Sequence, residues 1–175
     1  GPQPMSMGVP LLAGAGALPE QRMREACMAL AEGLGQRLQH HGVGESPQQL
    51  LSAIKPDSLV RLSGDPARPL PQGGNWLEAL ADWRRPLLLV VLGEPGGGIA
   101  GAAAAYTALC RELGVPLVGL IQIGGDWDIQ QRRRDGLPWC GWIPAASHPD
   151  HDLAVDGLVQ DLRRSTIRAR AKAVG

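Results

Sequence analysis

The sequence contains no Phe and only one Tyr, and its 17 basic side chains are balanced by 17 acidic ones. A core without Phe has to be built from Leu, Val, Ile, Ala and the five Trp residues. The zero net charge argues against a general nucleic-acid or membrane-surface binder, because the affinity of both rests on excess positive charge. We therefore expect partners that are neither nucleic acid nor membrane.

Cysteine is also scarce, with Cys27, Cys110 and Cys140 far apart in the chain. An odd number of cysteines without close spacing fits neither a disulfide framework nor a zinc site, so no metal is expected. The sequence shows no apolar run of about 18 residues, and we expect neither a membrane span nor a signal peptide. A reducing cytoplasm is the predicted location.

The length of 175 residues and an apolar content of 44% predict one globular domain. We place this α/β domain at residues 7–165. Residues 1–6, which open with Gly1-Pro2, look like the disordered remnant of a protease cleavage site. Residues 166–175 are basic and are expected to form a fraying tail.

The centre of the chain, residues 85–125, predicts a strand–helix–strand crossover. Apolar runs at residues 87–92 and 117–123 flank a glycine-rich turn and a small-residue helix over 98–113. Neither run alternates with polar residues, which indicates parallel strands buried on both faces. Gly114 and Pro116 end the helix between them.

Further apolar patterns extend this fold on both sides. The helix that starts at Pro19 carries apolar residues through Leu38 and is expected to end at Gly42 and Gly44, after His40-His41. Shorter segments predict strands at 9–13, 58–62 and 139–143, helices at 46–54 and 76–83, a short helix or loop at 126–135, and a last helix capped by Asp150 or Asp152. The expected fold is a three-layer α/β domain with about five mostly parallel strands.

Two glycine-rich loops each follow a predicted strand. The candidate ligand-binding residues of the second loop are Gly93, Glu94, Gly96, Gly97, Gly98 and Gly101. Three of its glycines match G-x-G-x-x-G, which brings backbone close to a pyrophosphate at a helix N-terminus. Glu94, however, places a negative charge there, and close helix–strand packing is the alternative interpretation of the glycines.

The first loop occupies the place of a phosphate-binding P-loop. Its residues at that position are Gly14, Gly16, Pro19, Glu20 and Gln21. The pattern G-x-x-x-x-G-K-[ST] would need Gly, Lys and Ser or Thr at positions 19, 20 and 21. Glu20 reverses the charge that should face phosphate, and Pro19 removes an N–H donor, so we predict a degenerate P-loop.

Other polar clusters allow two interpretations each. The run Arg132, Arg133 and Arg134 could contact an anion or form a solvated loop. His148 and His151, with Asp150 and Asp152 beside them, could bind a metal, but a loop that caps the last helix is the favoured interpretation because Pro149 interrupts the segment. No catalytic residue is assigned, since no nucleophile has a partner that the sequence can place nearby.

The order of these parts resembles dethiobiotin synthetase and its relatives in the P-loop NTPase superfamily. The matching pieces within residues 58–124 are SLVRLSGDPARPLP, NWLEALADW, RPLLLVVL and GVPLVGLIQI, and PWCGWIP follows them. The resemblance implies a P-loop-type sheet and an ATP- and magnesium-dependent ligase that carboxylates a diamine. The family's Lys and Ser/Thr correspond to Glu20 and Gln21, its metal-binding Glu to Ser63, and its adenine-contacting Asn to Gln122 or Ile123.

These departures lead to two hypotheses. The first is a pseudoenzyme without a cofactor that acts by binding a protein partner or by forming a homo-oligomer such as a dimer. The alternative is an enzyme that binds a small-molecule ligand at residues 93–101, either ATP with magnesium, as a ligase of the dethiobiotin synthetase type, or NAD(P).

Overall fold

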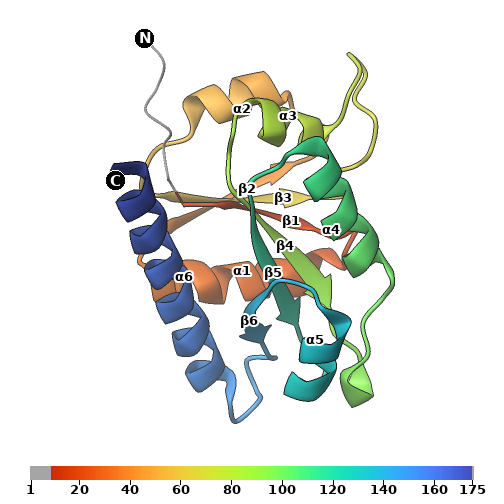
Figure 1. Cartoon of the computed structure of the whole chain (residues 1–175), viewed down its shortest axis with the longest axis vertical. Coiled ribbons are helices and arrows are strands. Elements are labelled where there is room, and N and C mark those ends of the chain that lie inside the picture. Colours follow the sequence, from red (N-terminus) through yellow and green to blue (C-terminus); the bar gives the residue numbers. More distant parts are fainter. Residues whose placement is uncertain (1–8, 175) are drawn as a thin grey trace.

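A computed structural model describes residues 9–174, with side chains through residue 165, and contains one six-stranded parallel sheet in the order β2-β3-β1-β4-β5-β6 (Figure 1). The strands are β1 (Leu11–Gly14), β2 (Arg37–Gly42), β3 (Ser58–Ser63), β4 (Leu87–Leu92), β5 (Leu117–Ile123) and β6 (Trp139–Ile143). The helices are α1 (Glu20–Leu34), α2 (Pro47–Ala53), α3 (Trp76–Asp82), α4 (Ala102–Leu113), α5 (Ile129–Asp135) and α6 (His151–Val174), with a short 3-10 turn η1 at Pro95–Gly97.

Helices cover both faces of the sheet and bury a separate apolar cluster on each. On one face, α1 and α6 pack over residues such as Leu12, Leu88 and Ile121. On the other face, α2, α3 and α4 enclose a cluster that contains the fully buried Trp76, whose indole N–H donates to the Val43 carbonyl at 3.1 Å. The predicted three-layer α/β class is therefore confirmed, with six strands rather than about five.

The central crossover lies where the sequence predicts it. β4 and β5 have the predicted bounds, and they pair in parallel with each other and with β1 and β6. Their side chains are almost all buried because helices lie on both sides of the sheet. The helix between them begins at Ala102 rather than at residue 98, since residues 95–101 form the turn η1 and an irregular loop.

The prediction for the end of the first helix is wrong. α1 ends at Gly35, which adopts left-handed backbone angles with φ of 67°, and the Gln36 N–H donates back to the Ala31 carbonyl. Residues 37–42 then form the edge strand β2, so His40-His41 lie on a strand and not at a helix end. The spacing of apolar residues continues past the helix end, and so suggested a longer helix, because Leu34 on α1 and Leu38 on β2 pack against the same cluster.

The ends of the chain also bear on the predicted domain bounds. α6 extends to Val174 and thus includes residues 166–174, where the sequence suggests a fraying tail. The predicted N-terminal remnant, residues 1–6, lies outside the described residues.

Replacing Gly35 with Ala tests this helix end. Nothing lies within 4 Å of an added Cβ there, so the cost comes from the left-handed backbone alone. We expect a loss of about 1 kcal/mol in the free energy of unfolding, measured by urea denaturation. Gly44→Ala is the matched control, because Gly44 is exposed, lies in open space and has no positive φ; equal losses in both variants would contradict a left-handed helix end at Gly35.

Candidate functional site

The two glycine-rich loops lie together at the carboxyl edge of the sheet. β1 and β4 are neighbours, and the chain leaves β1 toward β2 on one side but leaves β4 toward β5 on the other. This is a topological switch point, the place where open α/β sheets bind ligands. The fold therefore brings together the loops 14–21 and 93–101, which the sequence singled out separately.

The α1 end of this site is occupied by an ion pair within the chain. Glu20, the first residue of α1, accepts a hydrogen bond from the Nη2 group of Arg61 on β3. Arg61 is only 2% exposed, and its Nε donates to Nδ1 of His40 at 2.6 Å. Within the described part of the chain, its Nη1 has no hydrogen-bond partner. A carboxylate of the protein thus lies at the helix N-terminus, the position at which a P-loop would hold phosphate.

This cluster shifts the pKa of both groups that bind Arg61. The hydrogen bond from Arg61 is the main cause that lowers the pKa of Glu20, and the Arg61 charge adds to it. Desolvation, followed by the charges of Arg61 and Arg24, lowers the pKa of His40. Sequence reasoning recognised Glu20 but missed Arg61 and His40, although a single Arg inside the apolar strand SLVRLS is a signal of a buried pair.

The second loop is closed by hydrogen bonds from its neighbours. The Gly96 N–H donates to Oδ2 of Asp126 at 2.7 Å, and the Gly97 N–H donates to the Glu94 carbonyl. Gly93 is buried, and an added Cβ would collide with the side-chain amide of Gln122. The glycines thus allow close packing against β5, and two of the amides that a pyrophosphate would need already donate within the chain.

Arg132 on α5 holds this loop by a hydrogen bond and is itself bonded to Gln122 on β5. Arg132 is 6% exposed and donates to the Gly97 carbonyl at 2.7 Å and to Oε1 of Gln122 at 2.9 Å. The Gln122 amide donates to the carbonyls of Gly124 and Asp126. Of the predicted anion contacts, Arg132 is therefore engaged inside the protein, while Arg133 and Arg134 are exposed.

Other polar side chains near these loops and before α6 also have partners within the protein. After β3, Asp65 accepts a hydrogen bond from the Tyr106 hydroxyl, and burial followed by this contact raises the pKa of Tyr106 to about 12. His148 packs edge-on against Trp142 and accepts from the Asp150 N–H, so this segment is the turn before α6. No group of three or more His, Cys, Asp or Glu side chains suited to a metal occurs among the described residues.

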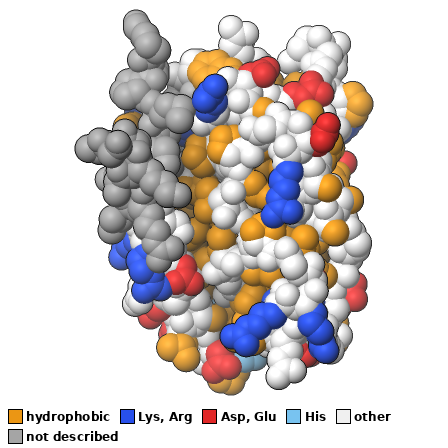
Figure 2. Space-filling model, viewed as in Figure 1, with side chains coloured by type: hydrophobic (Ala, Val, Ile, Leu, Met, Phe, Trp, Pro, Cys, Tyr) orange, Lys and Arg blue, Asp and Glu red, His pale blue; other side chains and the backbone are white. Residues whose placement is uncertain are grey.

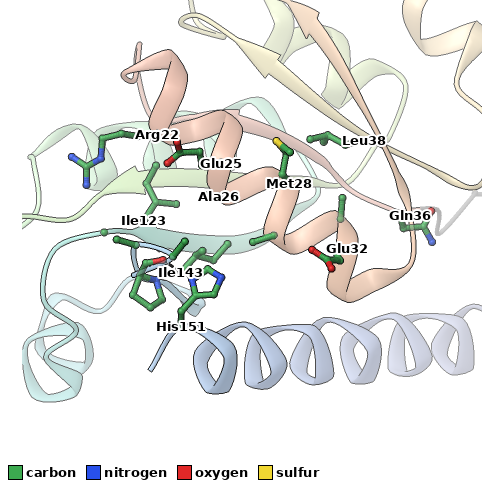
Figure 3. A pocket seen from close by; sticks show the side chains of 16 residues that line it. Arg22, Glu25, Ala26, Met28, Glu32, Gln36, Leu38, Ile123, Ile143 and His151 are labelled. Carbon is green, nitrogen blue, oxygen red and sulfur yellow. Dashed lines mark hydrogen bonds between the residues drawn. The ribbon is translucent and has the colours of Figure 1, made fainter. Parts of the chain in front are cut away.

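Two open hollows lie outside both loops, the larger one beginning at Arg22, directly after the first loop. The larger, of about 730 Å³, follows α1 from Arg22, continues past the helix end to Gln36, and is bounded by His151 and the end of β6 (Figure 3). A hollow of about 350 Å³ lies between β2 and α2 and is lined by polar residues such as His41 and Glu45. Neither includes a residue of loops 14–21 or 93–101.

On the face that Figure 2 shows, basic and acidic side chains are mixed, and neither kind forms a large patch. Among the described residues, no helix combines the length and the apolar character needed to cross a membrane.

The pairing of Glu20 with Arg61 predicts a pH-dependent stability. Because folding lowers the pKa of Glu20 from its usual 4.5, the pair stabilises the fold above that value, and this stabilisation is lost as the pH falls through the folded pKa. Glu20→Gln should cost about 1–2 kcal/mol at pH 7, less than for a fully buried pair because the Glu20 side chain is 55% exposed. Urea denaturation across pH 3–7 measures it.

The difference in the free energy of unfolding between wild type and Glu20→Gln should become smaller toward pH 3. Glu32→Gln, on the exposed side of the same helix, is the control and should differ little from wild type at any pH. If the free energy of unfolding of Glu20→Gln differs from that of wild type by the same amount at every pH, the stabilising role of the ion pair is refuted.

The role of Arg132 is tested by Arg132→Lys. A lysine lacks the forked guanidinium that bonds Gly97 and Gln122 together, so a buried acceptor is left unpaired. We expect a loss of about 1–3 kcal/mol and faster hydrogen exchange at Gly96 and Gly97. The control is Arg133→Lys, because Arg133 is exposed, and its free energy of unfolding should remain within about 0.5 kcal/mol of wild type. Equal losses in the two variants would contradict the role of Arg132 in holding the loop.

Neither models of known protein families nor curated protein sequences give a match to this chain, so the geometry of the two loops is what bears on its function.

Proposed function

We propose that this chain is a non-catalytic domain, resembling degenerate dethiobiotin synthetase-like P-loop proteins, that acts by binding a protein partner or a second copy of itself. The observation that carries the proposal is the internal pairing at both loops of the switch point. Glu20 lies at the N-terminus of α1 against Arg61, and Asp126 and Arg132 hold the loop at residues 93–101.

The polar groups that the resemblance would assign to nucleotide binding support this proposal. Glu20 and Gln21 stand where Lys and Ser or Thr would be needed, and the Gln21 amide donates to Glu25 within α1. Gln122, at the place of the adenine-contacting side chain, is fully buried with its amide and carbonyl both bonded inside the protein. A phosphate arriving here would meet carboxylates, and the buried Arg61 and Arg132 already donate to Glu20 and to the Gly97 carbonyl.

A second candidate, a nucleotide- or dinucleotide-binding enzyme, is favoured by one observation only. Both loops leave the sheet at the switch point between β1 and β4, where ligands bind in many open α/β sheets. Such an enzyme would use ATP with magnesium, or NAD(P), at the loop Gly93–Gly101.

Thermal melts with and without millimolar Mg-ATP, ADP, NAD and NADP separate the two candidates. A ligand at about 100 times its Kd would add about 2.7 kcal/mol to the stability of the native state, which corresponds to a rise of several degrees in a domain of this size. For the non-catalytic domain we expect no shift with any of the four.

A reproducible rise with one nucleotide would overturn the proposal and establish the second candidate. Gly98→Val then locates the site, because a valine would narrow the space beside Glu94, whose carboxylate lies 3.1 Å from an added Cβ. That variant should abolish the shift if the ligand binds at this loop, and Gly44→Val in open space should leave the shift intact.

A further inference from the structure

The guanidinium of Arg61 on β3 joins three elements of the fold. In the parallel pairing of β2 with β3, His40 lies opposite Arg61. The Arg61 Nε donates to Nδ1 of His40 at 2.6 Å, and its Nη2 donates to Glu20 at the start of α1. Arg61 is buried, whereas His40 and Glu20 are exposed. Protons from solvent therefore reach both of the groups that bind this buried cation.

The contact between Arg61 and His40 sets the protonation state of the imidazole ring. A guanidinium only donates hydrogen bonds, so Nδ1 of His40 has to be an acceptor and carries no proton. The proton of the neutral ring is then on Nε2. An imidazolium carries a proton on both nitrogens and cannot accept from Arg61 in either ring orientation. Protonation of His40 therefore removes an acceptor from Arg61.

The surroundings of Arg61 offer little to replace that acceptor. Among the described residues, its Nη1 already lacks a hydrogen-bond partner. The Cys27 thiol on α1 does not become a charged partner, because burial raises its pKa to about 12. Loss of the His40 contact would leave a second N–H group of a buried guanidinium unpaired, with Glu20 as its remaining partner, and such groups are costly to keep inside a protein.

We propose that His40, Arg61 and Glu20 form an acid-sensitive latch, which holds the edge strand β2 against β3 and α1 at neutral pH and loosens it on acidification. This inference goes beyond the proposed function and does not depend on it. β2 pairs with β3 alone, whereas β4 has a strand on each side. The edge of the sheet should therefore open while its centre stays closed.

The charges around His40 set the direction of the response. Arg61 from β3, Arg24 and Glu20 from α1, and His41 from the same strand all act on this ring. Desolvation, followed by the charges of Arg61 and Arg24, lowers the pKa of His40 from its usual 6.5, against the opposing charge of Glu20. The contact thus stabilises the fold above pH 6.5, and this stabilisation is lost as the pH falls through the folded pKa. Glu20, whose pKa is lowered from 4.5, responds only in more acidic solution.

Amide hydrogen exchange between pH 7 and pH 4.5, expressed as protection factors that remove the intrinsic pH dependence, tests the latch. In wild type, protection of the β2 amides and of the Val43 N–H, which donates to the Ser63 carbonyl, should fall about five- to tenfold, while that of β4 stays constant. His40→Asn keeps an acceptor for Arg61 but does not titrate, so this variant should lose no protection on acidification. His41→Asn is the matched control, because His41 lines the hollow between β2 and α2, and it should respond to pH as wild type does.

NMR of the ring nitrogens in wild type keeps the inference testable if a variant fails to fold. At pH 7 the proton of His40 should be on Nε2 and not on Nδ1. A protonated Nδ1, a β2 protection that does not change with pH, or an equal fall in wild type and His40→Asn would each overturn the inference. An equal fall in β2 and β4 would overturn it too, because the whole domain and not its edge would then be responding.

Discussion

The parallel pairing of β1 with β4 at the centre of the sheet determines where the other parts of the molecule can lie. Leu11 to Gly14 align with Leu87 to Val90, so both strands end at the same edge. Since α1 and α4 cover opposite faces, the chain leaves this edge in two directions, and the loops 14–21 and 93–101 follow neighbouring strands. The Glu20–Arg61 pair involves the first of these loops, and the hydrogen bond from Arg132 to the Gly97 carbonyl involves the second.

At these two loops, charged side chains of the protein pair with one another and with backbone groups. Carboxylates stand against the helix start and against a loop amide, and buried guanidiniums pair with them or with carbonyl groups. Arg61 and Arg132 are both nearly inaccessible, and such charges are tolerated only when partners surround them. The charged groups named here are thus bonded within the protein, although Nη1 of Arg61 has no hydrogen-bond partner among the described residues.

The sequence predicted the buried strands well because a short, continuous apolar run between turn residues is typical of a strand covered on both faces, as β4 and β5 illustrate. It failed at Gly35, where a left-handed turn reverses the chain but Leu38 happens to continue the helical spacing. The contacts of the site were harder to foresee. Glu20 and Arg61 are 41 residues apart, and only the alignment of β3 beside β1 brings them together.

The arrangement of α1 and α6 on one face has a consequence for biosynthesis. Ile121, Ile123 and Ile143 of β5 and β6 are covered by Val155, Leu158 and Val159 of α6, a helix that follows all six strands in the chain. Until the ribosome has released that helix, this face of the sheet remains open to solvent and to chaperones. The folding of this face should therefore finish only after translation of α6.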